Sequence, residues 1–267
     1  MLLLLSKPCP LSLGPGKDIF LSSLNPKTKG ATDNPNLDAT SMAAPGLILH
    51  TYFRSSSAAR LRIALNLKGI QYKSVYVNLG TGEQTTPAYL ALNPSGTVPL
   101  LVHGAPGGDI SIGQSVAALE YLEEVFTTTA ALLPSLEDSA GRAFVRELVS
   151  VVVADMQPVT SLRLQAAIEK GGMDTAEWTR TWTTRGLVVY EKLLAREGRK
   201  EGRFSYGDSP TLADVCLVPA LWNATGNGLD LSQYPKLNDV FREMQALEAV
   251  QNAHWQRQGD TPAGLKI

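Results

Sequence analysis

Near the start of the regular part of the chain, a short apolar run passes through three consecutive serines into a segment with helical periodicity. Apolar residues are contiguous at Leu47–Leu49 but recur three and four positions apart from Leu61 onward, so the chain changes from strand to helix across Arg54–Ala58. Ser55–Ser57 lie at this change, where a serine hydroxyl can cap a helix. The unpaired N–H groups of the same helix start can also bind an anion. This stretch alone leaves both interpretations open.

The pattern after Gly46 predicts alternating strands and helices in the order βαβαββα, which is that of a thioredoxin-like domain. The first two strands should be parallel because a helix connects them, whereas a glycine-rich turn makes the last two a hairpin. The predicted strands are 47–52, 72–79, 98–103 and 109–112, and the predicted helices are about 56–68, 88–92 and 114–124.

Pro99 opens the third predicted strand, where a proline removes one donor from the sheet ladder. A cis Val98–Pro99 bond would explain its presence by turning the Val98 backbone outward, so that it could pair with a peptide ligand. An ordinary trans proline at a strand edge is the alternative.

From about residue 135 the pattern is helical throughout, and this half is predicted to be an all-helical domain. Helical periodicity covers about 137–157, 160–169, 175–197, 211–224 and 236–249, with a break at Pro158. The predicted domains are therefore a thioredoxin-like one at 46–126 and an all-helical one at 135–262, joined by a linker at 127–134 and followed by a tail at 263–267.

Composition excludes several classes of function. The 267 residues are 44% hydrophobic, which suffices for a large core. A net charge of −1, from 24 basic and 25 acidic residues, gives no general field for nucleic acid or anionic membranes. Cys9 and Cys216 are the two cysteines, so we expect no disulfide framework and no cysteine metal site.

Residues 1–45 are rich in Pro, Ser, Asn, Gly and Thr without sustained periodicity, and we expect a disordered extension there. The apolar run at its start is too short for a secretory signal, and no basic residue precedes it. A mitochondrial presequence would be rich in arginine, whereas the first arginine here is Arg54. We therefore expect a cytoplasmic protein that spans no membrane.

Three motifs, taken in order, resemble the zeta class of glutathione transferases, whose best-known members are maleylacetoacetate isomerases. They are Tyr52–Leu65, Leu92–Pro99 and Ile112–Glu124, and the resemblance runs from about residue 47 to 262. It implies a glutathione-binding first domain, a helical second domain and a homodimer. Asp208–Asp214 resembles the family's helix cap, in which Thr211 caps the helix and the Asp214 carboxylate reaches back.

The resemblance also implies roles for individual residues. Ser55 corresponds to the catalytic serine of the class, and Ser56 is the second candidate for the catalytic hydroxyl. Arg54 is a candidate for binding a substrate carboxylate. The glutathione-binding candidates come from several loops and helix starts, and they are Ser57, Arg60, Gln84, Val98, Gln114, Ser115 and Gln157.

The implied activity is a cis–trans isomerisation in tyrosine and phenylalanine breakdown, with glutathione as a cofactor that supplies a thiolate. A free thiol, with a pKa of about 8.5, is mostly protonated at neutral pH, so a hydroxyl and a helix dipole would have to favour the anion. Gly226 departs from the family, which commonly has an arginine there. That difference favours a general transferase that conjugates or dehalogenates small electrophiles. A non-catalytic interaction module is the third alternative, but the presence of Ser55 argues against it.

Overall fold

The protein is described here by a computed structural model, which defines residues 46–105, 108–197 and 200–267. All of these residues belong to one compact unit, Thr40–Ile267. The extension predicted at 1–45 lies outside the described residues.

A four-stranded sheet forms the first half, in the order β2-β1-β3-β4. β1 is parallel to β2 and antiparallel to β3, and β3 forms an antiparallel hairpin with β4. The thioredoxin-like prediction is therefore confirmed. The elements are β1 (Leu47–Thr51), α1 (Ser56–Leu67), β2 (Lys73–Tyr76), α2 (Pro87–Leu92), β3 (Leu100–Ala105), β4 (Gly108–Ile112) and α3 (Ser115–Val125).

β2 is shorter than the predicted strand 72–79, because a local hydrogen bond turns the chain soon after the strand ends. The Asn78 side chain accepts from the Gly80 N–H at 3.0 Å, and two short 3₁₀ helices follow at Leu79–Thr81 and Glu83–Thr85. Asn favours such turns because its side chain competes with the ladder for backbone donors.

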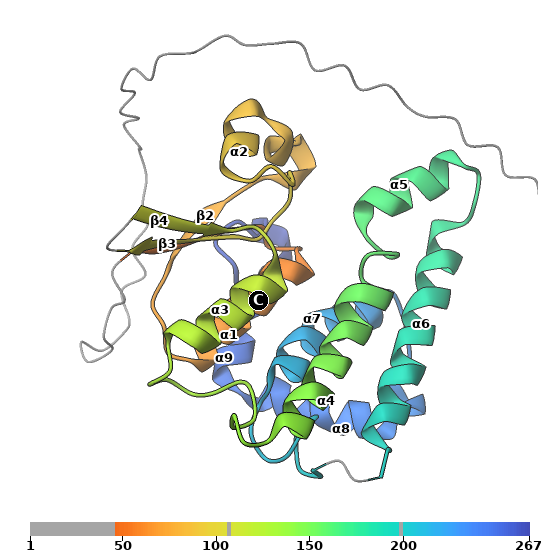
Figure 1. The fold of residues 1–267 in the computed structure, drawn as a ribbon. Coiled ribbons are helices and arrows are strands. Elements are labelled where there is room, and N and C mark those ends of the chain that lie inside the picture. Colours follow the sequence, from red (N-terminus) through yellow and green to blue (C-terminus); the bar gives the residue numbers. More distant parts are fainter. Residues whose placement is uncertain (1–45, 106–107, 198–199) are drawn as a thin grey trace, which may run out of the picture. The chain divides into compact units, whose positions relative to one another are not determined.

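The second half is helical, as predicted. Leu247 has an extended backbone, so the single helix expected at 236–249 is two helices. The predicted helix 137–157 ends in a π-helical segment, Val151–Met156. The α-helices are α4 (Ser139–Ser150), α5 (Leu162–Lys170), α6 (Thr175–Leu194), α7 (Leu212–Gly226), α8 (Pro235–Ala246) and α9 (Glu248–Ala253). Figure 1 shows α7 and α9 beside α1, with α5 and α6 farther from it.

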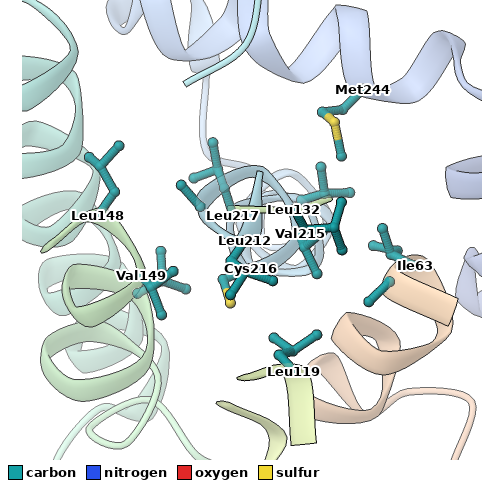
Figure 2. Packing of buried hydrophobic residues seen from close by; sticks show 14 of the residues in the cluster. Ile63, Leu119, Leu132, Leu148, Val149, Leu212, Val215, Cys216, Leu217 and Met244 are labelled. Atoms are coloured by element: carbon teal, nitrogen blue, oxygen red, sulfur yellow. The ribbon is translucent and has the colours of Figure 1, made fainter. Parts of the chain in front are cut away.

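α7 is the centre of the core. It is apolar on all sides, as expected of a helix surrounded by protein. Figure 2 shows Cys216 of α7 among side chains from α1 and α3 as well as from the helical half, including Ile63, Leu119 and Val149. Both predicted domains thus share one core, and their exact boundaries remain a prediction. In the described parts of the chain, no helix has the length and hydropathy needed to cross a membrane.

The predicted helix cap before α7 is confirmed. The buried Asp214 carboxylate accepts hydrogen bonds from the Thr211 N–H at 2.7 Å and the Thr211 hydroxyl at 2.8 Å. It also accepts from the Ser205 N–H at 2.8 Å. Burial raises the pKa of Asp214, and these hydrogen bonds oppose that shift.

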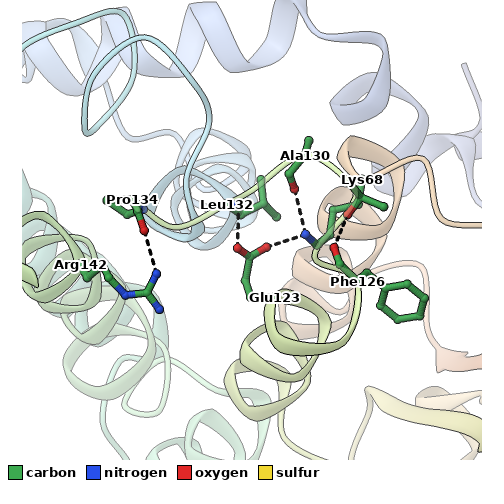
Figure 3. Close-up of polar contacts among 8 residues, drawn as sticks. Lys68, Glu123, Phe126, Ala130, Leu132, Pro134 and Arg142 are labelled. Carbon is green, nitrogen blue, oxygen red and sulfur yellow. Dashed lines mark hydrogen bonds and ion pairs between the residues drawn. The ribbon is translucent and has the colours of Figure 1, made fainter. Parts of the chain in front are cut away.

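A buried ion pair fixes the stretch predicted as a linker (Figure 3). Lys68, at the end of α1, lies 2.7 Å from Glu123 of α3 and donates to the Ala130 carbonyl at 2.8 Å. Glu123 in turn accepts from the Leu132 N–H at 3.0 Å. Further along, Arg142 donates to the Pro134 carbonyl at 2.7 Å. The connection is thus held at several points along its length.

Candidate functional site

Ser55 lies between a tight turn and the first helix. Its N–H donates to the Tyr52 carbonyl at 3.0 Å, which closes a four-residue turn at the end of β1. Its hydroxyl oxygen accepts from the Ala58 N–H at 3.1 Å and caps α1. Because the oxygen acts as the acceptor in this bond, the hydroxyl proton can still be donated to a ligand. Ser56 and Ser57 are the first two residues of α1 and are half-buried.

Arg60 connects this helix to the start of α3. Its Nη1 donates to the Ser115 hydroxyl at 3.1 Å, and both side chains are buried. Within the described part of the chain, its Nε and Nη2 have no hydrogen-bond partner. Burial lowers the pKa of Arg60. A buried guanidinium with two donors to spare favours an anionic or carbonyl ligand nearby, since unpaired buried donors are costly.

Val98 lies against the turn Tyr52–Ser55. It is buried and packs with Val77 and Tyr89 in a small cluster that Tyr52 also contacts. The Val98–Pro99 bond is cis, so the cis interpretation is confirmed. The pairing of β3 with β1 ends at Leu100, and Val98 therefore lies beyond the sheet ladder.

Two further candidates lie near these elements. Gln84 is in the second 3₁₀ helix, and its backbone lies close to Gly96, in the loop before Val98. A Cβ added to Gly96 would lie 3.3 Å from the Gln84 carbonyl oxygen. Its Oε1 is buried and has no hydrogen-bond partner among the described residues. Gln114 precedes α3 as an exposed residue whose side chain makes no capping bond.

The remaining candidates lie elsewhere. Gln157 follows the π-helical segment in the helical half, and its N–H donates to the Val152 carbonyl at 2.9 Å. Arg54 is exposed, with its guanidinium 5.2 Å from the ring centre of Trp255. The structure thus joins Arg60 directly to Ser115 and places Val98 beside the turn that carries Ser55. In the described part of the chain, Gln157 makes no hydrogen bond with these residues.

Two residues near the site were not predicted. Arg62 is fully buried and donates to the Phe53 carbonyl at 3.3 Å, and Asp260 accepts from the Phe53 N–H at 2.9 Å. Arg62 could have been found from the sequence, because a charged residue on the buried side of a helix needs polar partners. Asp260 could not, because it lies 207 positions from Phe53, its hydrogen-bond partner.

The arrangement suits an anion better than a metal ion. The Ser55 proton, the start of α1 and the Arg60 donors are all electropositive. No group of three His, Cys, Asp or Glu residues is placed to hold a metal ion in the part of the chain that the structure describes. These groups fit a thiolate that is bound next to a peptide-like chain with carboxylates at its ends.

Known proteins resemble the chain over both halves. The family models for the N-terminal and C-terminal domains of glutathione S-transferase match residues 54–125 and 184–243. A maleylacetoacetate isomerase from Aspergillus fumigatus is 45% identical over 232 residues, which are 86% of this chain and 98% of that protein.

Solved structures agree in fold and sequence. A bacterial zeta-class glutathione S-transferase, described as a maleylpyruvate isomerase, has a TM-score of 0.74 and 39% identity over 80% of this chain and all of the other. The maleylacetoacetate isomerase of Anaeromyxobacter dehalogenans, solved with glutathione in its active site, has a TM-score of 0.73 and 42% identity over 81% of this chain and 98% of the other. The chain therefore belongs to the zeta class of glutathione transferases, the family of the maleylacetoacetate isomerases.

Proposed function

We propose that the protein catalyses the glutathione-dependent cis–trans isomerisation of maleylacetoacetate to fumarylacetoacetate, a step of tyrosine and phenylalanine catabolism. The observation that carries this proposal is the Ser55 hydroxyl, which accepts from Ala58 and keeps its proton available at the start of α1. Membership of the isomerase family supports the choice of reaction.

Bound glutathione would supply a thiolate that adds to the cis double bond and leaves after bond rotation, so it is not consumed. Ser55 would donate a hydrogen bond to the sulfur and so favour the thiolate, and the dipole of α1 would favour it further. Ser56 is the second candidate for this donor. Arg54 would bind a carboxylate of the substrate.

The other candidates would hold the tripeptide. Gln114 and Ser115 would bind the γ-glutamyl end, where Arg60 orients the Ser115 hydroxyl. The Val98 backbone would pair with the cysteinyl residue as an added strand. Gln84 would approach the glycyl end, Ser57 would contribute from the first turn of α1, and Gln157 would reach in from the helical half.

Turnover of maleylacetoacetate by the purified protein, measured with and without glutathione, tests the proposal. We expect isomerisation only when glutathione is present. Maleylpyruvate should be assayed beside it, because a similar structure is described as a maleylpyruvate isomerase. No turnover of either enone at millimolar glutathione would refute the isomerase function.

A general glutathione transferase is the second candidate, and Gly226 favours it. Gly226 ends α7, and a Cβ added there would meet no atom within 4 Å. The chain thus lacks an arginine at a position that has room for one. Conjugation of α-halo acids, together with no isomerisation of either enone, would support this candidate.

We also propose that the protein is a cytoplasmic homodimer with two-fold symmetry, as the family resemblance implies. Light scattering at micromolar concentration should give twice the chain mass of 28.7 kDa. A monomer under these conditions would contradict the proposed assembly.

A further inference from the structure

Phe53, in the middle of the turn before Ser55, is held on both sides of its backbone by side chains from outside the turn. Its N–H donates to Asp260 Oδ2 at 2.9 Å, and its carbonyl accepts from Arg62 Nη2 at 3.3 Å. The turn itself closes through the bond from the Ser55 N–H to the Tyr52 carbonyl. The position of Ser55 therefore depends on Asp260 and Arg62 as well as on its own helix.

Arg62 extends this contact in two directions. Its Nη1 donates to the Thr51 hydroxyl at 2.8 Å and to the Tyr52 carbonyl at 3.3 Å. Its Nε donates to the carbonyl of Ala253, the last residue of α9, at 3.2 Å. Burial lowers the pKa of Arg62 to about 10, so the group is still a cation at neutral pH. The Arg62 guanidinium thus bridges the turn Tyr52–Ser55, called the catalytic turn below, and the C-terminal part of the chain.

The stretch from Ala253 to Thr261 is itself well fixed. The Gln258 amide donates to the Asn252 carbonyl at 3.0 Å and to the His254 carbonyl at 2.8 Å. The Trp255 ring lies 6.4 Å from the Phe53 ring and beneath the Arg54 guanidinium. Asp260 therefore approaches the turn from a folded segment that also packs against it.

We propose that the stretch Ala253–Thr261 is a clamp for the catalytic turn, in which Asp260 is a positioning residue that sets the direction of the Ser55 hydroxyl. The inference rests on the proposed role of Ser55 as the donor to the glutathione thiolate. Asp260 acts through the Phe53 N–H and touches neither glutathione nor substrate. Its second oxygen, Oδ1, is buried and has no hydrogen-bond partner among the described residues, while the charges of Arg62 and Lys266 also act on the carboxylate.

Two substitutions at position 260 separate the hydrogen bond from the charge. Asp260→Ala removes the acceptor, whereas Asp260→Asn keeps an acceptor oxygen without the charge. The readout is the ultraviolet absorbance of the thiolate in the enzyme–glutathione complex, titrated with pH. We expect Asp260→Ala to raise the pKa of the bound thiol and to lower turnover by about 10-fold, since the donor is misdirected. Asp260→Asn should restore both values to near those of the parent.

Asp230→Ala is the matched control. Asp230 also accepts from a backbone N–H at 2.9 Å, that of Ser232, but it lies in another loop. This change should leave the thiol titration unaltered. If Asp260→Ala does not fold, Asp260→Glu provides the test, because it keeps the charge but moves the acceptor by one methylene. Asp260→Glu should then raise the pKa of the bound thiol, but by less than is expected for Asp260→Ala.

The proposal is overturned if Asp260→Ala, or Asp260→Glu in its place, titrates like the parent. It is also overturned if Asp260→Asn behaves like Asp260→Ala, since the charge rather than the hydrogen bond would then matter. The titration needs no second substrate, so a failure to isomerise either enone leaves this result intact. A parent protein that binds no glutathione would refute the proposed function and this proposal together.

Discussion

At the scale of single residues, the capping bond of Ser55 does not compete with the role proposed for its hydroxyl. The oxygen accepts from the Ala58 N–H and stabilises the start of α1, so the proton can still be donated. An N-cap of this kind contributes about 0.5–2 kcal/mol to stability. The same bond holds the Ser55 oxygen in place, and a fixed position is what a preorganised site requires.

Replacing Ser55 by alanine should therefore separate catalysis from binding. We expect Ser55→Ala to keep glutathione affinity within a few-fold, because most predicted contacts lie elsewhere, and to lower turnover by about 10²-fold. The rate should continue to rise toward high pH where the parent has levelled off, because the bound thiol would have a higher pKa. Calorimetry and pH–rate profiles measure the two effects.

Ser56→Ala and Ser57→Ala are the controls for that experiment. Both residues lie inside the first turn of α1, and neither caps it. Their loss should affect turnover less than the loss of Ser55. An unchanged rate in Ser55→Ala, together with an inactive Ser56→Ala, would move the catalytic role to Ser56.

Sequence reasoning reached the residues of the site that lie in local motifs. The local patterns placed Ser55 and Ser115 at helix starts, and the resemblance to the family gave these two positions their predicted roles. Asp260 and the bond that it makes could not be predicted, because nothing local connects a C-terminal turn to a loop at the other end of the chain. The bond between Arg60 and Ser115 depends in the same way on how α1 and α3 pack, which periodicity does not define.

At the scale of elements, the ion pair between Lys68 and Glu123 fixes where the chain leaves the sheet half. The Lys68 side chain is buried and that of Glu123 is mostly buried, with 1% and 10% of their surfaces exposed. A buried charge that loses its partner is costly, whereas removing both charges costs less. The pair therefore matters most when only one member is changed.

We expect Lys68→Met to destabilise the protein by about 3–5 kcal/mol, because Glu123 would then be buried without its cation. Adding Glu123→Gln should recover part of the loss, because the amide oxygen can still accept from the Leu132 N–H. Urea denaturation of the two single variants and the double variant measures this coupling. Additive losses would show that the two charges do not interact.

Element types were predicted better than element ends. The breaks that were missed depend on single residues, namely Asn78, which shortens β2, and Leu247, which divides the last predicted helix. Neither residue interrupts hydrophobic periodicity, so the pattern runs through both positions. Pro158 was recognised as a break because proline cannot continue a helix without losing a hydrogen bond.

At the scale of the whole molecule, the two halves share one core. α1 packs against α7 and α9 as well as beside the sheet, and Leu61, Ile63 and Ala64 are fully buried. Cutting the chain between the halves would expose this apolar surface on both fragments. The halves should therefore depend on one another for folding.

A fragment of residues 46–134 should accordingly fail to form a cooperative domain. We expect it to bind a hydrophobic dye and to lack a sharp thermal transition, because apolar side chains of α1 and α3 would lose their partners on α7. Mixing it with a fragment of residues 135–267 should reduce dye binding. A stable, cooperatively melting 46–134 fragment would contradict the shared core.

The stability of the whole molecule should fall on mild acidification. Burial lowers the pKa of His50 and His254 from 6.5, so the folded state resists protonation more than the unfolded state. The stability that these two histidines contribute is therefore present above about pH 6.5 and is lost as the pH falls through their lowered pKa values, because the unfolded chain then binds more protons. Melting temperatures between pH 7.5 and pH 5 should show this decline.

His254→Gln should weaken that decline without abolishing it, since His50 is unchanged. His254 lies between the rings of Trp222 and Trp255, and Arg257 and Arg62 oppose its protonation. Its Nδ1 accepts from a backbone N–H, which only an unprotonated Nδ1 can do. A pH dependence identical to that of the parent would show that His254 does not contribute.

The bond between Phe53 and Asp260 also has a consequence for protein synthesis. A ribosome makes Asp260 207 residues after Phe53, so the turn that carries Ser55 lacks one of its supports until Asp260 has been made. The sheet half leaves the ribosome well before that moment. Nascent chains that stop short of Asp260 would thus contain every predicted catalytic and glutathione-binding residue and still lack a finished active site.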